Sequence, residues 1–107
     1  MAEYLPAAKV SEIPDPGRLL VELDDRLIVV LHAAGSFYAL DDICTHDGGP
    51  LSDGELDTED LSIACPRHGA KFSLRDGAAM TMPAIQATVS HEVKIEDDTV
   101  MVKLNDS

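Results

Sequence analysis

Apolar runs rich in β-branched and aliphatic residues in the first forty positions, separated by short polar turns, predict β-strands joined by tight turns. Two runs rich in β-branched and aliphatic residues, 18–23 and 26–33, are separated only by Asp24-Asp25, which is typical of a two-residue hairpin. A further turn leads into a third short run, 37–40. We therefore expect the N-terminal part of the chain to form an antiparallel β meander.

The last twenty residues repeat this pattern. Apolar residues and one histidine alternate with polar residues, first at Val89, His91, Val93 and Ile95, and again after a turn, at Val100, Val102 and Leu104. Such a period of two predicts strands with one buried face. The two ends of the chain, 1–40 and 79–107, should therefore form one antiparallel β base.

The middle of the chain, 41–78, has a different character. It is rich in turn residues, and between positions 41 and 61 it holds eight carboxylates and no Lys or Arg. No segment shows a helical period or an internal repeat. Roughly forty residues of loops and short strands need something other than apolar burial to order them, and a metal site would do so. We expect one domain, 1–107, in which 41–78 is an inserted subdomain.

Composition and charge exclude several classes of partner. The 107 residues include 8 Lys and Arg against 20 Asp and Glu, which gives a formal charge of −12. This balance argues against nucleic acid and against an anionic membrane, because both require basic surfaces. Hydrophobic residues make up 45% of the chain, enough for a globular core. The charge therefore favours a soluble protein, which we expect to be a monomer, and any protein partner should present a basic surface.

The compartment follows from what the sequence lacks. The N-terminus has no basic region followed by an apolar run, and no apolar run approaches the ~20 residues needed to cross a bilayer. We expect a cytoplasmic protein. Two cysteines in a reducing compartment are a poor basis for a structural disulfide, so a metal is the more useful hypothesis.

Both cysteines and two of the four histidines form two short motifs, Cys44-x-His46 and Cys65-x2-His68. Two thiolates and two imidazoles suit a tetrahedral zinc ion, or an iron–sulfur cluster in which histidines ligate one iron. Small zinc modules usually pair cysteine with cysteine and histidine with histidine, whereas each loop here offers one of each. This mixed pairing favours a two-iron centre, and zinc remains the alternative.

The segments 44–51 and 65–72 resemble the two cluster loops of Rieske [2Fe–2S] proteins, most of all the Rieske-type ferredoxins of bacterial multicomponent aromatic-ring oxygenases. Pro83 matches the proline segment that shields the cluster in that family. The resemblance implies an all-β Rieske fold, with an antiparallel base and a cluster-binding subdomain at 41–78. It also implies one [2Fe–2S] cluster per chain, and four ligands. By this likeness the inner iron is held by Cys44 and Cys65, and the outer iron by His46 and His68.

The sequence departs from the Rieske proteins of respiratory complexes at four positions. Gly49 and Arg67 stand where those proteins have a second pair of cysteines, so the loops cannot be joined by a disulfide. Ala70 and Phe72 stand where those proteins place Ser and Tyr, whose hydroxyls bond to cluster sulfurs. Fewer donors leave the charge of the reduced cluster less stabilised. We therefore predict a midpoint potential of roughly −150 to 0 mV, the low end of the Rieske range.

The resemblance implies a function in electron transfer. The chain would carry single electrons from an NAD(P)H-dependent flavoprotein reductase to a terminal non-haem iron oxygenase, and it would have no catalytic residues of its own. The alternatives are a Rieske subunit of a nitrite reductase, an accessory protein of iron–sulfur assembly, or a zinc-binding interaction module. We interpret His32 and His91 as structural residues. The acidic run 41–60 is either a solvated face or a surface that steers basic partners.

Overall fold

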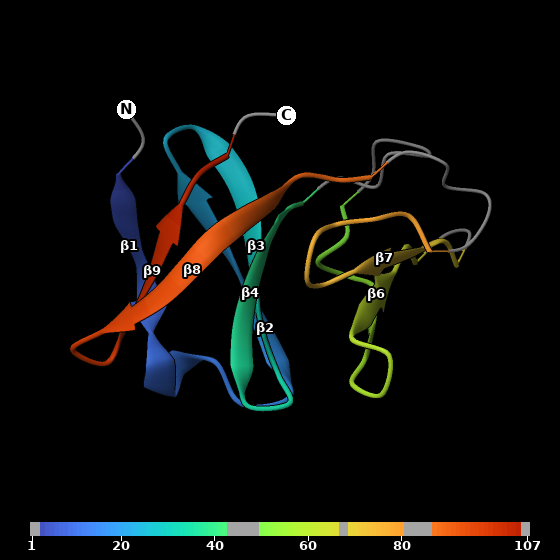
Figure 1. Cartoon of the computed structure of the whole chain (residues 1–107), viewed down its shortest axis with the longest axis horizontal. Coiled ribbons are helices and arrows are strands. Elements are labelled where there is room, and N and C mark those ends of the chain that lie inside the picture. The colour runs from blue at the N-terminus through green and yellow to red at the C-terminus, as the bar shows by residue number, and fades with distance from the viewer. Residues whose placement is uncertain (1–2, 43–49, 67–68, 81–86, 106–107) are drawn as a thin grey trace.

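A computed structural model describes residues 3–42, 50–66, 69–80 and 87–105. Within these residues the chain forms short and medium strands and one turn of 3₁₀ helix (Figure 1). In chain order they are β1 Tyr4–Lys9, η1 Val10–Glu12, β2 Gly17–Leu23, β3 Arg26–Ala33, β4 Ser36–Asp41, β5 Glu55–Asp57, β6 Ser62–Ala64, β7 Lys71–Ser73, β8 Ser90–Glu96 and β9 Thr99–Lys103. The all-β class expected from the sequence is confirmed.

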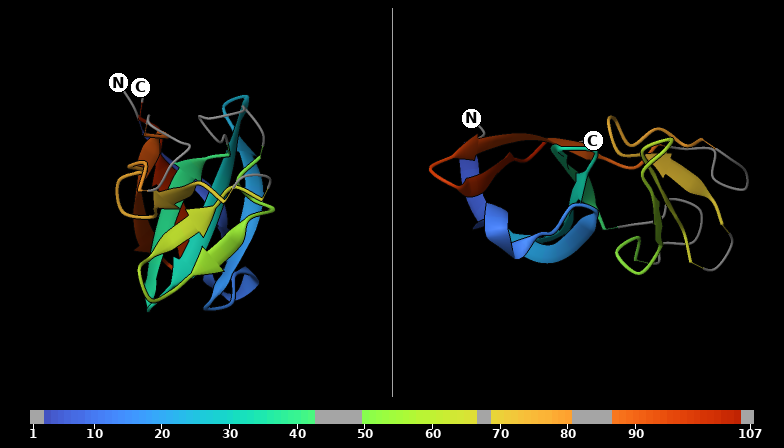
Figure 2. Two further views of the ribbon diagram at one scale, coloured as in Figure 1. Left: turned by 90° about the vertical axis from the view of Figure 1, so that its right-hand side faces the viewer. Right: turned by 90° about the horizontal axis from the view of Figure 1, so that it is seen from below.

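The two ends of the chain build one six-stranded antiparallel sheet, in the order β1-β9-β8-β4-β3-β2. Seen from below, this sheet curls into an open ring in which β1 approaches β2 (Figure 2). The antiparallel base predicted from the alternating residues is therefore present. β1 was not among the expected strands, because Pro6 interrupts its pattern and a bulge lies between Pro6 and Ala8 where it pairs with β9.

The predicted hairpins have the backbone that their sequences suggest. Asp24 and Asp25 connect β2 to β3 with φ angles of 53° and 63°, and Asp97 and Asp98 connect β8 to β9 with 51° and 62°. Aspartate tolerates this left-handed region better than most residues, which fits a primed two-residue turn. The third hairpin, between β3 and β4, places Ala34 at φ 51° without that advantage.

A second, three-stranded antiparallel sheet, β5-β6-β7, lies beside the base (Figure 1). β3 is buried on both of its faces. Ile28 and Val30 point into the core of the base, whereas Val29 and Leu31 belong to the core shared with the small sheet. A strand covered on both faces needs a continuous apolar run rather than alternation, and residues 28–31 supply one. β3 thus contributes side chains both to the core of the base and to the core shared with the small sheet.

Candidate metal centre

Cys65 directly follows β6 in the small sheet. Its side chain is 1% exposed, and it belongs to an apolar core that includes Ala70 and Phe72. The Cys65 N–H donates to the Ala70 carbonyl at 2.7 Å, and the Gly69 N–H donates to the Cys65 carbonyl at 2.9 Å. Gly69 has a φ of +72°, which suits glycine. The described ends of the β6–β7 connection are therefore hydrogen-bonded to each other, and the Cys65 thiol lies in an apolar core.

The other three predicted ligands, Cys44, His46 and His68, lie outside the described residues, as does Pro83. In the ranges that the structure covers, no three His, Cys, Asp or Glu side chains gather so that they could hold a metal ion. Cys65 is therefore the one predicted ligand among the described residues.

The segments that flank the two predicted ligand loops meet in space. Asp42, just before the first loop, accepts hydrogen bonds from the backbone N–H of Ser52 at 2.6 Å and from its hydroxyl at 3.1 Å. Two residues later, Gly54 packs on Ala64, the residue before Cys65. The structure thus brings the base of the first loop to the start of the second. A buried thiol at this junction, in an apolar core, fits a cluster that binds thiolate in a low-dielectric site.

The segment that leads to the predicted proline segment around Pro83 runs along β7. Phe72 forms an isolated antiparallel bridge with Ala79, and the Met80 N–H donates to the Lys71 carbonyl at 2.8 Å. Met80 is 44% exposed. The approach to the predicted proline segment is therefore fixed beside the strand that follows Cys65.

Two carboxylates of the acidic run have structural roles that the sequence did not indicate. Asp42 is buried, and Asp41 accepts hydrogen bonds from Arg26 Nη2 at 3.0 Å and from His91 Nε2 at 2.8 Å. A run of eight carboxylates gives no sign of which side chains point into the protein. The structural roles of Asp41 and Asp42 come from their position at the end of β4, where the chain leaves the base for the first loop.

Other members of the run remain on the surface of the small sheet. Asp53, Glu55 and Glu59 are exposed, and Asp57 and Asp60 form ion pairs with Lys71 at 3.7 and 3.3 Å. The Ser62 hydroxyl, followed by Lys71, lowers the pKa of Asp60, and Asp60 in turn raises the pKa of Lys71. The positive charge of Lys71 therefore offsets part of the negative charge on the surface of the small sheet.

The structure gives both remaining histidines structural partners, as the sequence suggested. The His32 ring stacks on Phe37 with centroids 3.9 Å apart, and its Nδ1 donates to the Ile13 carbonyl at 2.9 Å. His91 is buried, and its Nδ1 accepts the Asn105 N–H at 2.9 Å. Burial lowers the pKa of His91 although Asp41 opposes this shift, so the neutral ring with hydrogen on Nε2 satisfies both bonds.

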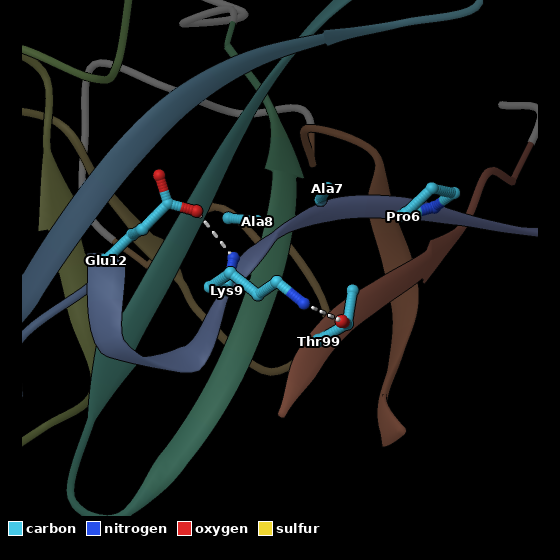
Figure 3. Close-up of a pocket in the computed structure, with 6 residues that line it drawn as sticks. All are labelled: Pro6, Ala7, Ala8, Lys9, Glu12 and Thr99. Atoms are coloured by element: carbon cyan, nitrogen blue, oxygen red, sulfur yellow. Dashed lines mark hydrogen bonds between the residues drawn. The ribbon is translucent and has the colours of Figure 1, made fainter. Parts of the chain in front are cut away.

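A surface pocket of about 290 Å³ lies on the base, away from the small sheet. In Figure 3 Lys9 lies between Glu12 and Thr99, with its N–H bonded to the Glu12 carboxylate at 2.7 Å and its ammonium to the Thr99 hydroxyl at 3.3 Å. Remaining walls come from Pro6, Ala7 and Ala8. None of the residues that line this pocket is one of the four predicted ligands.

In the part of the chain that the structure covers, no helix has the length and apolar character needed to span a bilayer.

Comparison with known proteins identifies the family. The family model of the Rieske [2Fe–2S] domain matches residues 3–103. The chain is 33% identical over 97 residues to the 3-phenylpropionate/cinnamic acid dioxygenase ferredoxin subunit of Photorhabdus laumondii, covering 91% of this chain and 90% of that one. It is also 33% identical over 103 residues to the ferredoxin component of the naphthalene 1,2-dioxygenase system of Pseudomonas aeruginosa, covering 96% and 97%.

Solved structures agree with this result. A chain in the complex of reduced oxygenase and oxidized ferredoxin in carbazole 1,9a-dioxygenase superimposes with a TM-score of 0.86 and 28% identity, over 94% of this chain and 92% of that one. The relatives are named ferredoxin subunits or components, which carry electrons and do not perform the catalytic step. This chain therefore belongs to the Rieske [2Fe–2S] domain family, and it is a ferredoxin, an electron carrier with one [2Fe–2S] cluster.

Proposed function

We propose that this ferredoxin carries single electrons from an NAD(P)H-dependent flavoprotein reductase to the terminal non-haem iron oxygenase of an aromatic-ring dioxygenase system. The observation that carries the proposal is the full-length similarity to ferredoxins named as components of such systems. A similar chain in a solved complex of oxygenase and ferredoxin supports an oxygenase as the electron acceptor.

We further propose the residues that hold the cluster. Cys44 and Cys65 would ligate the inner iron, and His46 and His68 the outer one. The burial of Cys65 and the meeting of the two loop bases near Ala64 support this assignment. When bound, the cluster supplies a one-electron couple. With two neutral imidazoles it carries no net charge when oxidised and one negative charge when reduced, which makes reduction easier than for an all-cysteine cluster.

The division of the chain follows from the same proposal. Residues 41–78 would form the cluster-binding subdomain, inserted into a base made of 1–40 and 79–107. The buried apolar core around Cys65 would exclude water from the inner side of the cluster. The base would position the first loop through β4, which leads to Asp42, and the small sheet would position the second loop through β6, which leads to Cys65.

The exposed carboxylates of the small sheet support basic docking surfaces on the partners. Asp53, Glu55 and Glu59 point to association that is steered by charge and weakens as salt rises. We expect a monomer in solution. A cytoplasmic location is supported by the assignment of both cysteines to a cluster rather than to a disulfide.

The experiment is functional replacement. In the reconstituted naphthalene 1,2-dioxygenase system, this chain would replace the ferredoxin component, and product formation would be measured with reductase, oxygenase and NADH. The proposal predicts turnover that requires this chain and falls with ionic strength. The variant His68→Ala should abolish turnover, whereas His32→Gln, which keeps a donor for the Ile13 carbonyl, should not. A red-brown protein that the reductase cannot reduce would contradict the proposed partner, and a colourless protein containing zinc would contradict the cluster itself.

A further inference from the structure

Asp42 closes the base of the first ligand loop. Its backbone N–H donates to the Leu27 carbonyl on β3 at 3.0 Å, which fixes it to the base of the molecule. Its carboxylate accepts both the N–H and the hydroxyl of Ser52, and its side chain is nearly excluded from solvent. Residues 42 and 52, ten apart in sequence, are thereby joined. Hydrogen bonds to a buried carboxylate are among the strongest that a side chain makes.

Arg18 also binds the segment 52–54, from β2. It lies on β2, opposite Leu31 of β3, and its Nη1 donates to the Ser52 carbonyl at 2.7 Å and also to the Gly54 carbonyl. The three groups of Ser52 that can form hydrogen bonds are thus all engaged, two by Asp42 and one by Arg18. The return of the first loop is therefore fixed on the base by two side chains of opposite charge.

The segment held in this way also contacts the second ligand loop. Gly54 approaches Ala64 so closely that a Cβ built on it would lie 1.8 Å from the Ala64 carbonyl oxygen. Ala64 precedes Cys65, so the position of 52–54 limits where the second loop can begin. The chain has two cysteines, both assigned as ligands, so no disulfide can hold the loops together. Noncovalent contacts must do so.

We infer that Asp42 and Arg18 are positioning residues for the cluster, forming a clamp on Ser52 and Gly54 that holds the two ends of the first ligand loop together beside the start of the second. This inference rests on the proposed ligand set. Without the clamp, the ends of the first loop would be free to separate, and the ligands that they carry would no longer be held in one arrangement. The cluster would then be lost faster, and its electronic environment would become less uniform.

The test compares purified holoprotein variants. Asp42→Ala removes both bonds to Ser52, and Arg18→Met removes the donors while keeping most of the side-chain volume. Loss of a buried charge-assisted bond should speed loss of the visible absorbance roughly tenfold in the presence of an iron chelator. Both variants should also broaden the EPR signal of the reduced protein and shift its midpoint potential. A residue important only for folding would not produce these spectroscopic changes.

Three further variants make the comparison specific. Asp42→Asn should lose the cluster faster than wild type but more slowly than Asp42→Ala, because its amide can still bond to the N–H and the hydroxyl of Ser52 but carries no charge to strengthen these bonds. Lys9→Met removes one positive charge on the base and should change none of the readouts. Val102→Ala lowers stability from within the core of the base, and it should leave the EPR signal and the potential unchanged.

Ser52→Ala removes the hydroxyl bond alone, so it serves if the stronger variants fail to fold, and its rate of cluster loss should lie between wild type and Asp42→Ala. Rates, EPR signals and potentials for the clamp variants that match those of Lys9→Met and Val102→Ala would overturn the clamp. Equal damage from Asp42→Asn and Asp42→Ala would also overturn it, because the bonds to Ser52 would then not matter. A colourless wild-type protein would overturn the proposed cluster, a result distinct from iron-loaded variants that retain it normally.

Discussion

Replacement of Gly54 by alanine should push the end of the first ligand loop away from the start of the second. A Cβ at this position would lie 1.8 Å from the carbonyl oxygen of Ala64, whereas ordinary contacts begin at 3.4 Å. The Ala64 oxygen is a backbone atom, and the position of the added Cβ is set by the backbone of residue 54, so no flexible side chain can move aside. Overpacking of this kind costs about 1–3 kcal/mol, and more where backbone must shift.

The hydrogen bonds of Gly54 make it costly to relieve this clash by moving the backbone. Its N–H donates to the Leu51 carbonyl at 2.9 Å, and its carbonyl accepts a hydrogen bond from Arg18. Moving residue 54 away from β6 would therefore strain the contacts that hold the first loop. Cys65, one residue beyond Ala64, would lose its fixed relation to that loop. We expect Gly54→Ala to lower both the melting temperature and the iron content of the purified protein.

Gly35→Ala is the matched control. Gly35 has a φ of +81°, and a Cβ added to it would meet nothing within 4 Å, so the change adds backbone strain of about 1–2 kcal/mol without a clash. Its hairpin lies in the base, between β3 and β4. We expect this variant to be destabilised to a similar degree but to keep its full iron content. Iron measured per chain and thermal melting by circular dichroism distinguish the two. Full iron content and normal cluster retention in Gly54→Ala would refute the reasoning.

Three further predictions concern stability and potential. Because burial lowers the pKa of His91, the unfolded chain binds that proton more readily, so the His91 contribution to stability is present above about pH 6.5 and is lost as pH falls below it. The melting temperature should therefore fall more between pH 7.5 and 5.5 in wild type than in His91→Gln, and equal falls would contradict this. Ala34→Asn should stabilise the exposed β3–β4 turn by about 0.5–1 kcal/mol, since Asn tolerates φ 51° better than Ala; unchanged or lower melting temperature would argue against it. Ala70→Ser should raise the midpoint potential by about 40–60 mV if its hydroxyl bonds to the cluster, a value that corresponds to about 1 kcal/mol favouring the reduced form, and voltammetry that shows no rise would exclude that bond.

The sequence predicted the strands of the base well where a local rule applies. The Asp24-Asp25 and Asp97-Asp98 turns stand between strands that pair in the expected way, because primed turns require particular residues. β1 was missed because its pattern is broken at Pro6. The short strands β5 to β7 were anticipated only as a mixture of loops and short strands, since three residues are too few to show a period.

The candidate site was predictable only as far as its chemistry is local. The spacing of Cys44, His46, Cys65 and His68 pointed to a metal, and the family match shows a [2Fe–2S] cluster, while the four ligands stay a prediction. The roles of Asp42 and Arg18 could not be predicted in the same way. They depend on contacts between residues ten to 36 apart, which only the folded chain brings together. A carboxylate within an acidic run gives no local sign that it is buried.

Pulsed EPR of the dithionite-reduced protein tests the central claim most directly. The account predicts a paramagnetic reduced cluster with nitrogen couplings from two histidine ligands, and these couplings should change when histidine is labelled with ¹⁵N. The variant His68→Ala should not retain both couplings, whereas His32→Gln should. A reduced cluster without histidine nitrogen couplings, or a protein without any EPR signal that contains zinc, would contradict the assignment of Cys44, His46, Cys65 and His68.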